Sequence, residues 1–398
     1  MNNNILKDID DTKNYALITF ILFWSGLAIM SSLYVTIPLV SVFSQIFSVG
    51  LSKAVWTSSA FSLCFAIGCL FHGPLSDRYG RKKIIIFGLT SLTIVSFLLG
   101  ITHTLEMLII LRGVQGAAAA TFSPVALSYA VELFPPKKRV VAIGFISTGF
   151  LMAGIIGQVF SSFANQNYGW NSVFYILGFV YLMTTILIVL FIPNIPISQP
   201  DSSLLNAFKQ MKSVLKLKSL RYSYIVAGVI LLSFVGMYSA LGSFLSSSKF
   251  NFTNQQILYV RLIGIIGMVL SPCAGKLVGK FSIMSVLRGS LALSIIGLTL
   301  IGISNCASFM IVMSVIFVIG IALTIPTLIS LIGMIGGKAR GSAVSMYTFI
   351  LFLGASIGPV LTIRLLKSGS YIITFTSLAL CLGVGLLATF FINIETNN

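Results

Sequence analysis

Residues 73–83 read Gly-Pro-Leu-Ser-Asp-Arg-Tyr-Gly-Arg-Lys-Lys, and they separate two long apolar runs. Each run has about the 20 apolar residues that an α-helix needs to cross the hydrocarbon of a bilayer. The segment is therefore a short charged turn between two membrane-spanning helices. Its glycines at 73 and 80 permit a tight turn and a close approach of helices. Asp77 is the one acid of the turn, among four basic residues.

The composition of the whole chain requires lipid as the main solvent. Of the 398 residues, 57% are hydrophobic and 8% are charged, and the mean hydropathy is +1.03. A soluble domain carries about 25% charged residues, so these charges could not cover a surface that faces water. The net charge of +17 would favour nucleic-acid binding in a soluble protein. No basic face with interleaved aromatic residues accompanies it, and no nucleic-acid partner is expected.

Apolar runs of spanning length recur along the chain on both sides of this turn. Twelve can be counted, which predicts an all-α membrane protein with twelve transmembrane helices. The predicted spans are residues 15–37, 54–73, 82–101, 107–131, 140–163, 172–193, 222–246, 256–275, 286–303, 308–333, 342–364 and 371–393.

The basic residues fall mainly on one side of this topology. If residues 1–13 are cytoplasmic, 19 of the 25 Lys and Arg residues belong to the cytoplasmic side, 4 to the outer side and 2 to span interiors. Cytoplasmic loops of membrane proteins carry such an excess. Both termini are therefore expected inside, in a multi-pass protein of the plasma or inner membrane. Residues 1–13 lack the pattern of a cleaved signal peptide, so the first span is expected to stay attached.

Landmarks in the two halves of the chain recur at an offset of 201 or 202 residues. The aligned pairs are Gly73 with Gly275, Arg139 with Arg340, and Gly157 with Gly358. Two parallel six-helix repeats explain the offset, and transporters built in this way bind their substrate between the halves. The predicted units are an N-terminal six-helix bundle, a cytoplasmic linker and a C-terminal six-helix bundle, at residues 1–193, 194–221 and 222–398.

The linker has apolar residues at helical spacing between residues 204 and 215, with four lysines around them. One interpretation is an amphipathic helix on the anionic inner leaflet. The other is a solvated tether.

The turn at 73–83 resembles the loop signature between helices two and three of the major facilitator superfamily, and it matches every defined position. The resemblance implies a twelve-helix transporter fold in which Asp77 faces the start of helix eleven, near Arg340–Ala343, and latches one conformation. The alternative is a basic loop that only sets topology. Glu132 either pairs with Arg78 or Arg81 or is a simple helix-end charge. The candidate latch residues are Gly73, Asp77, Arg78, Gly80, Arg81, Lys82 and Glu132.

Span four contains Arg112-Gly-Val-Gln115-Gly, which resembles a second signature of the family. A charge inside the membrane usually lines a cavity or finds a partner. The resemblance places Arg112 and Gln115 in a coupling network beside the substrate path. The alternative is an arginine whose long stem reaches the outer interface.

Span five resembles a degenerate form of the antiporter signature, with Gln158 at its last glycine position. Small residues at this spacing also permit close packing of helices, so packing and gating both stay open. The candidate residues here and in the corresponding span eleven are Gly149, Gly154, Gly157, Gly354, Gly358 and Pro359.

Span one resembles that of the twelve-span drug:proton antiporters, but Ser31 and Ser32 stand where many members have an aspartate. All eight acidic residues of the chain fall in termini, loops or helix ends. Coupling therefore uses Glu106, Glu132 or His103 at the edges, or the mechanism is uniport, or the substrate carries the proton.

Arg112 and Arg261 lie inside spans with no acidic neighbour, which favours an anionic or zwitterionic substrate. The interfacial alternative stays open for Arg261 as well. Tyr34, Phe65, Tyr238 and Tyr347 are the remaining candidates for the cavity, mostly because the resemblance places their helices there.

The resemblance predicts a secondary transporter that exports drug-like or metabolite compounds by alternating access, coupled to H+. A uniporter or importer of a small anionic or zwitterionic solute is the alternative. The expected partners are the substrate, the coupling ion and the bilayer, for a monomer without metal or cofactor. An enzyme is disfavoured because His72 and His103 fall near opposite faces and no carboxylate is interior.

Overall fold

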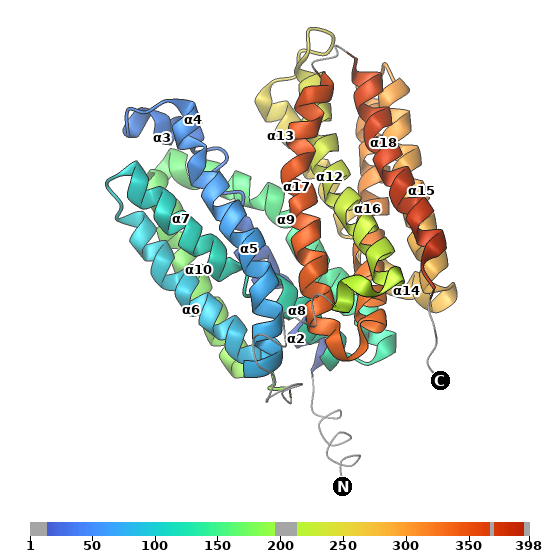
Figure 1. Ribbon diagram of the computed structural model, residues 1–398. Coiled ribbons are helices and arrows are strands. Elements are labelled where there is room, and N and C mark those ends of the chain that lie inside the picture. Colours follow the sequence, from blue (N-terminus) through green and yellow to red (C-terminus); the bar gives the residue numbers. More distant parts are fainter. Residues whose placement is uncertain (1–13, 196–212, 367–369, 394–398) are drawn as a thin grey trace.

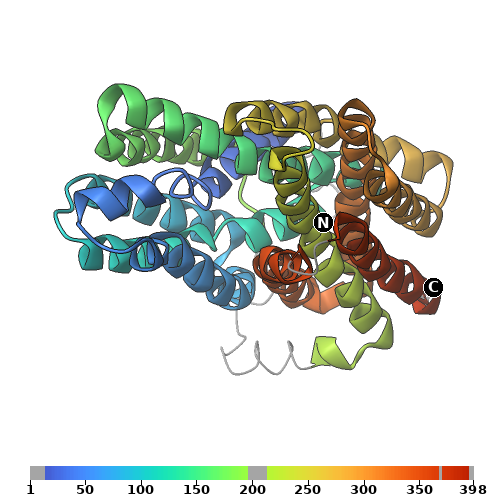
Figure 2. The same cartoon turned by 90° about the horizontal axis from the view of Figure 1, so that it is seen from above.

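The computed structural model describes residues 14–195, 213–366 and 370–393, and the regular elements in these ranges are all helical. Lipid offers no hydrogen-bond partners, and a helix satisfies its backbone within one segment. The helices stand side by side in two groups, one from each half of the chain (Figures 1 and 2). Exposed apolar side chains such as Phe87, Leu190 and Leu380 cover the outside of the bundle, as lipid-facing residues do.

The first half of the chain forms nine of the described helices. They are α2 (Tyr15–Ser31), α3 (Val40–Ile46), α4 (Leu51–Ala54), α5 (Trp56–Tyr79), α6 (Arg81–Gly100), α7 (Leu105–Ala119), α8 (Ser123–Leu133), α9 (Pro136–Tyr168) and α10 (Trp170–Phe191).

The second half has seven described α-helices and two short 3-10 helices. They are α12 (Lys218–Ser246), α13 (Asn254–Met268), α14 (Cys273–Lys280), α15 (Ile283–Ile303), α16 (Ala307–Ile335), η1 (Gly337–Ala339), α17 (Arg340–Leu366), α18 (Tyr371–Ala388) and η2 (Thr389–Phe391).

The predicted all-α membrane fold is confirmed. In the described ranges, eleven helical segments are long and apolar enough to cross a membrane. They account for predicted spans two to twelve. The first predicted span corresponds to α2, a shorter apolar helix of 17 residues. After Ser31 the chain continues in turns as far as Leu39, with the N–H groups of Ser32, Leu33 and Tyr34 bonded three residues back. Further along, Pro38 lacks a donor and disfavours helical geometry at Ile37.

Several helices extend beyond the predicted apolar runs. The helix α9 covers 136–168, whereas the run predicted for span five covers 140–163, and α12 begins at Lys218, four residues before its predicted start. Hydropathy marks only the part of a helix in hydrocarbon, whereas its ends continue into the headgroup layer, where basic residues are solvated. The predicted amphipathic helix of the linker lies mostly outside the described residues.

Corresponding helices pack in the same way within each half. In the first half α2 packs against α9, and in the second half α12 packs against α17. The contact between α5 and α7 corresponds to that of α13 and α14 with α16. The contact between α6 and α10 corresponds to that between α15 and α18. The shared pattern of contacts matches the repeat predicted from the sequence.

The two halves meet at the end of the bundle that carries both termini and separate toward the opposite end (Figure 1). There α5 contacts α17, and α9 contacts α14 and α16. A Cβ added to Gly73 would be 3.0 Å from the Gly341 carbonyl oxygen, and one on Gly144 would be 2.6 Å from the Pro272 Cα. Glycine therefore allows the backbones of the two halves to touch.

Glycines also form the closest helix contact inside each half. A Cβ on Gly149 would be 2.6 Å from the Phe23 carbonyl oxygen, and one on Gly157 would be 2.8 Å from that of Ser31, so both face α2. On α17, Gly354 lies against the Gly228 backbone, and a Cβ on Gly358 would be 2.5 Å from a carbonyl oxygen of α12. Gly157 and Gly358, aligned in the sequence repeat, thus occupy equivalent contacts.

We expect Gly358→Ala to destabilise the protein by about 1–3 kcal/mol, because the added methyl group has no room. Gly383→Ala is the matched control, since nothing lies within 4 Å of a Cβ built there. Alanine favours helix over glycine by about 1 kcal/mol, so this control should be neutral or stabilising. Thermal unfolding midpoints of the two purified variants provide the measurement. Equal midpoints would contradict close packing at Gly358.

Candidate functional site

A cavity of about 280 Å³ lies between the halves, with walls from α9 on one side and α12, α13, α16 and α17 on the other. The turn after α2 adds Tyr34 and Ile37. Aromatic rings contribute much of the apolar wall, at Phe150, Phe234 and Phe352. This volume is near the lower end of the roughly 300–1,000 Å³ of typical ligand sites. The cavity suits a small and largely apolar compound.

Arg261 is the one charged residue among those that line the cavity. It extends from α13 toward Gln158 on α9, with 3.5 Å between Nη1 and the amide Oε1. Gln158 also donates from Nε2 to the Gly154 carbonyl at 2.5 Å, which fixes the direction of its amide oxygen. This contact joins the two halves across the cavity.

Two donors in this region have no hydrogen-bond partner among the described residues. They are the Arg261 Nε and the Tyr238 hydroxyl, both buried. Buried polar groups are normally paired, so these two residues of the cavity wall have hydrogen-bonding capacity that the described residues leave unused.

The structure brings three of the predicted cavity residues together and leaves others elsewhere. Tyr34, Tyr238 and Arg261 line the cavity, as do Gly154 and Pro359 from the predicted gating positions. The Tyr34 ring packs over Gly154 of α9, and a Cβ built there would be 3.5 Å from its Cζ, an ordinary contact. Tyr347 is fully buried within α17 and does not line the cavity. Phe65 reaches it only through Phe352, with 4.7 Å between the ring centroids.

Sequence reasoning missed Gln158 and the aromatic wall. The signal for Gln158 was present, because it replaces the last glycine of the span-five pattern. A polar amide at a position where a family has glycine already indicates a contact that glycine cannot make. Phe150, Phe234 and Phe352 carried no such signal among the 31 phenylalanines of the chain.

Arg112 is fully buried within the first half and lies away from the cavity. Its guanidinium donates to the Thr57 carbonyl at 3.0 Å, the Ser32 carbonyl at 2.9 Å and the Gln115 side chain at 2.5 Å. The Phe61 ring lies 4.3 Å from its Cζ. The interfacial alternative for Arg112 is wrong, because its side chain has no exposure.

The helix break after Ser31 explains why Arg112 is held there. The chain turns at 32–39 and does not continue the helix, so carbonyls at this point need other donors. Arg112 supplies one to Ser32 and another to the Thr36 hydroxyl, at 3.2 Å. Gln115 extends the network by donating to Ser96 at 2.9 Å. Arg112 thus braces the broken first span against α5, α6 and α7.

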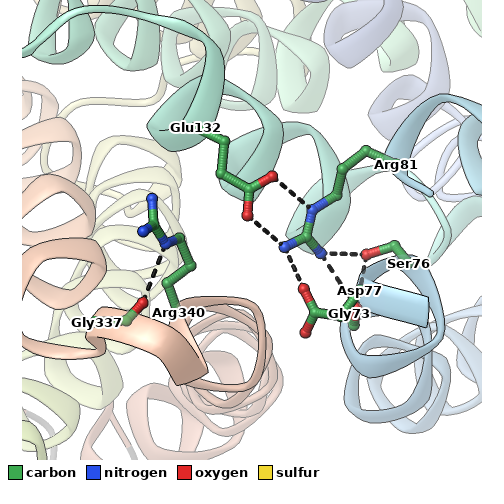
Figure 3. Close-up of polar contacts among 7 residues, drawn as sticks. All are labelled: Gly73, Ser76, Asp77, Arg81, Glu132, Gly337 and Arg340. Atoms are coloured by element: carbon green, nitrogen blue, oxygen red, sulfur yellow. Dashed lines mark hydrogen bonds and ion pairs between the residues drawn. The ribbon is translucent and has the colours of Figure 1, made fainter. Parts of the chain in front are cut away.

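At the end where the halves meet, Arg81 is the centre of a cluster of five residues, shown in Figure 3. Its guanidinium bonds the Glu132 carboxylate at 2.8 and 3.3 Å and the Gly73 carbonyl at 3.2 Å. It also bonds Ser76 and the Asp77 carboxylate. We call these residues, Gly73, Ser76, Asp77, Arg81 and Glu132, the Arg81 cluster. Of the two pairings weighed for Glu132, the one with Arg81 is formed.

The Asp77 carboxyl group points at the first turn of α17, in the second half. A Cβ on Gly341 would be 2.7 Å from the Asp77 Cγ, so only glycine leaves room for the carboxyl group. Helix N-termini carry partial positive charge and attract anions. Asp77 therefore joins the halves through Arg81 on its own side and the start of α17 on the other. The repeat-related position, Gly279, has no acid and touches nothing within 4 Å of a built Cβ.

The remaining residues of the predicted latch have local structural contacts. Gly80 has φ of +98°, a left-handed conformation that side chains rarely adopt, and it turns the chain from α5 into α6. Lys82 donates to the Val189 carbonyl at 2.8 Å and so holds the end of α10. Arg78 lies over the Tyr79 ring.

The family model for the Major Facilitator Superfamily matches residues 22–359, which is most of the chain. The protein belongs to this superfamily. As a major facilitator it is a multi-pass membrane protein and a secondary transporter of small molecules, not an enzyme.

Relatives of this major facilitator that align over most of its length include an uncharacterized transporter of Buchnera aphidicola subsp. Schizaphis graminum. It is 30% identical over 356 residues, which cover 89% of this chain and 86% of the relative. Multidrug resistance protein 3 of Bacillus subtilis is 34% identical, but over 124 residues that cover 31% of this chain and 24% of that one.

Solved structures show the same fold at low sequence identity. The transporter FucP in an outward conformation has a TM-score of 0.79 at 15% identity, with 96% of this chain and 98% of that chain covered. The human organic anion transporter MFSD10 has a TM-score of 0.76 at 16% identity, with 96% and 100% covered. These structures confirm the predicted major facilitator fold.

We expect Arg112→Met to destabilise this major facilitator by about 3 kcal/mol, because the Ser32 carbonyl and the Gln115 amide oxygen, both buried, lose their donor. The matched control is Arg364→Met, an exposed arginine in the last turn of α17, which should change stability by less than about 1 kcal/mol. Unfolding free energies in mixed micelles would measure both. An Arg112→Met protein as stable as the wild type would show that Arg112 does not stabilise the first half. It would then favour the role in coupling that the family resemblance implies.

Proposed function

We propose that this major facilitator exports small amphipathic organic anions by alternating access. The observation that carries the proposal is the cavity between the halves, whose lining has Arg261 as its charged residue and no carboxylate. The proposed units are the bundles 1–193 and 222–398, joined by 194–221 and pivoting about the cavity in a monomer. With the basic loops and both termini in the cytoplasm, the separated end of the halves would face outward. The likeness to FucP in its outward conformation supports this orientation.

The chemistry of the cavity supports an anion over a cation. An arginine in a largely apolar cavity attracts a carboxylate, sulfonate or phosphate group and repels an amine. The Arg261 guanidinium, the Tyr238 hydroxyl and the Gln158 amide belong to residues that line the cavity and are the polar groups closest to a bound anion. The aromatic wall would take the apolar body of the substrate. The MFSD10 structure, named as an organic anion transporter, has the same fold.

The direction of transport rests on resemblance and on energetics. The partial likeness to multidrug resistance protein 3 favours export. A membrane that is negative inside drives an anion outward, at about 2.3 kcal/mol per charge and 100 mV. Export of an anion therefore needs no coupling ion.

Proton coupling, expected from the drug:proton antiporters, has less support. Of the acids in the described ranges, Asp77, Glu106 and Glu132 lie at helix ends and none lines the cavity. We therefore favour uniport driven by the membrane potential, with H+ antiport as the second candidate. An importer of the same anions is the remaining alternative.

Flux from proteoliposomes tests this function. We expect saturable efflux of an aromatic carboxylate, accelerated by a potassium–valinomycin potential that is negative inside and unchanged by a pH gradient at zero potential. Benzylammonium, a cation of similar shape, should not compete. Arg261→Met should reduce anion flux at least tenfold, because the cavity loses its positive charge. Arg261→Lys should retain part of the flux.

Arg364→Met is the control for a general loss of charge, and its flux should equal that of the wild type. Saturable transport of the cation together with a response to the pH gradient would overturn the proposal in favour of a drug:proton antiporter. Flux that does not saturate would favour a channel.

We also propose that the Arg81 cluster latches the outward-facing state. Asp77 and the first turn of α17 touch only while the halves are together at the end that carries the termini. Arg81, which is itself bonded to Glu132, holds the Asp77 carboxylate in place. Separation of the halves would remove Asp77 from the positive end of α17. The latch should therefore favour the outward-facing state.

We expect Asp77→Asn to shift the conformational equilibrium by about 1 kcal/mol, roughly fivefold in the ratio of the two states. Spin labels at Lys83 and Lys276, both exposed and on opposite halves, would measure the distance between the halves at this end. The variant should show a larger fraction of the long distance that belongs to separated halves. Glu106→Gln removes the same charge at the opposite end of the bundle and should leave the distances unchanged. An Asp77→Asn distance distribution like that of the wild type would refute the latch.

A further inference from the structure

A second hollow lies on the outside of the bundle, separate from the substrate cavity. It has a volume of about 700 Å³ and is bounded by α2, α9 and the break between α13 and α14. Its walls are almost entirely apolar, with Phe20, Phe23, Phe145 and Met152 among them. Phe20 and Phe145 are 59% and 42% exposed. This groove is therefore open to the surroundings of the bundle, which at this depth are lipid.

The end of the groove near the termini is basic. Lys137 and Lys138, in the first turn of α9, line it there, and the Lys138 Nζ lies 4.7 Å from the Tyr15 ring centroid. The ion pairs in the described ranges are made by Arg81, so no carboxylate there neutralises these lysines. From Lys137 to Met152 the groove follows α9 for about 22 Å at 1.5 Å per residue. One leaflet with its headgroups measures about the same.

Both halves of the chain build the groove. Val269 and Pro272 come from the second half, and the other walls come from the first. Between them the Thr148 hydroxyl donates to the Met268 carbonyl at 3.1 Å, and Gly144 lies against Pro272. The groove therefore exists in this form only while the halves are together at this end.

We propose that this groove binds one anionic phospholipid, with an acyl chain along α9 and the phosphate at Lys137 and Lys138. The apolar walls match the chain, the length matches one leaflet, and the lysines attract a negative headgroup at the membrane surface. Since the lipid would touch both halves, its binding favours the conformation described here over one in which they have separated. The site is a lateral one for lipid and does not depend on what the central cavity transports.

Native mass spectrometry of the purified full-length protein tests the site without any substrate. We expect one phosphatidylglycerol to bind at least tenfold more tightly than phosphatidylcholine with the same acyl chains. Lys137→Ala/Lys138→Ala should reduce phosphatidylglycerol binding to the phosphatidylcholine level. Lys276→Ala/Lys280→Ala removes two exposed lysines from the same end of the bundle, outside the groove, and should bind like the wild type.

Two tryptophan variants test the same groove without changing any charge. Ala16→Trp fills the groove at an exposed position beside Lys138 and should exclude the lipid, whereas Leu190→Trp adds the same ring to an exposed site on α10. Equal binding of the two phospholipids, or undiminished binding by Lys137→Ala/Lys138→Ala or Ala16→Trp, would overturn the proposal. Binding that appears only after removal of residues 1–13, which contain Asp8, Asp10 and Asp11, would overturn it as well, because that acidic segment would then be the occupant.

Discussion

A charge that leaves water for a lipid-embedded bundle must find partners there, and two arginines of this protein show how the structure meets that requirement. Arg112 is surrounded by neutral acceptors, among them the Ser32 and Thr57 carbonyls and the Gln115 amide. Arg81 is held by two carboxylates, a carbonyl and a hydroxyl. Because each guanidinium offers five donors in a rigid plane, each one fixes several helices at once. The first-half bundle is organised around these two points.

The two arginines differ in whether the residues they hold contact one half of the chain or both. The partners of Arg112 belong to the first half, so it stabilises that half whatever the other does. Arg81 holds Asp77, and the Asp77 carboxyl group lies against Gly341 of the second half. The same kind of interaction thus lies within one half in one place and at the contact between the halves in the other. Glycines at the junction, such as Gly73 and Gly144, allow this contact because they let backbones approach without side chains between them.

Arg261 is the third arginine inside the bundle, and its partners are incomplete. A single contact of 3.5 Å to Gln158 is all that the described residues offer it, and its Nε is buried without a partner. An incompletely satisfied charge beside a cavity attracts a solute of opposite sign. The proposal of an anionic substrate therefore rests on the same requirement that explains Arg81 and Arg112. The lipid proposed for the groove beside α9 follows from the same requirement, because its phosphate would pair with lysines at the membrane surface.

The resemblance to the major facilitator superfamily, and not the residues themselves, placed Asp77 against the start of α17. Local signals in the sequence determined the span number, the turn at Gly80 and the repeat. These features depend on hydropathy and on short motifs, both of which are properties of neighbouring residues. Only the tertiary structure decided that Arg112 turns into the first half, that Tyr347 lies away from the cavity, and that Gln158 reaches Arg261. The rotation of each helix about its axis sets these contacts, and it is fixed by packing between segments far apart in the chain. When a helix is hydrophobic on every face, its sequence does not indicate which face packs against its neighbours.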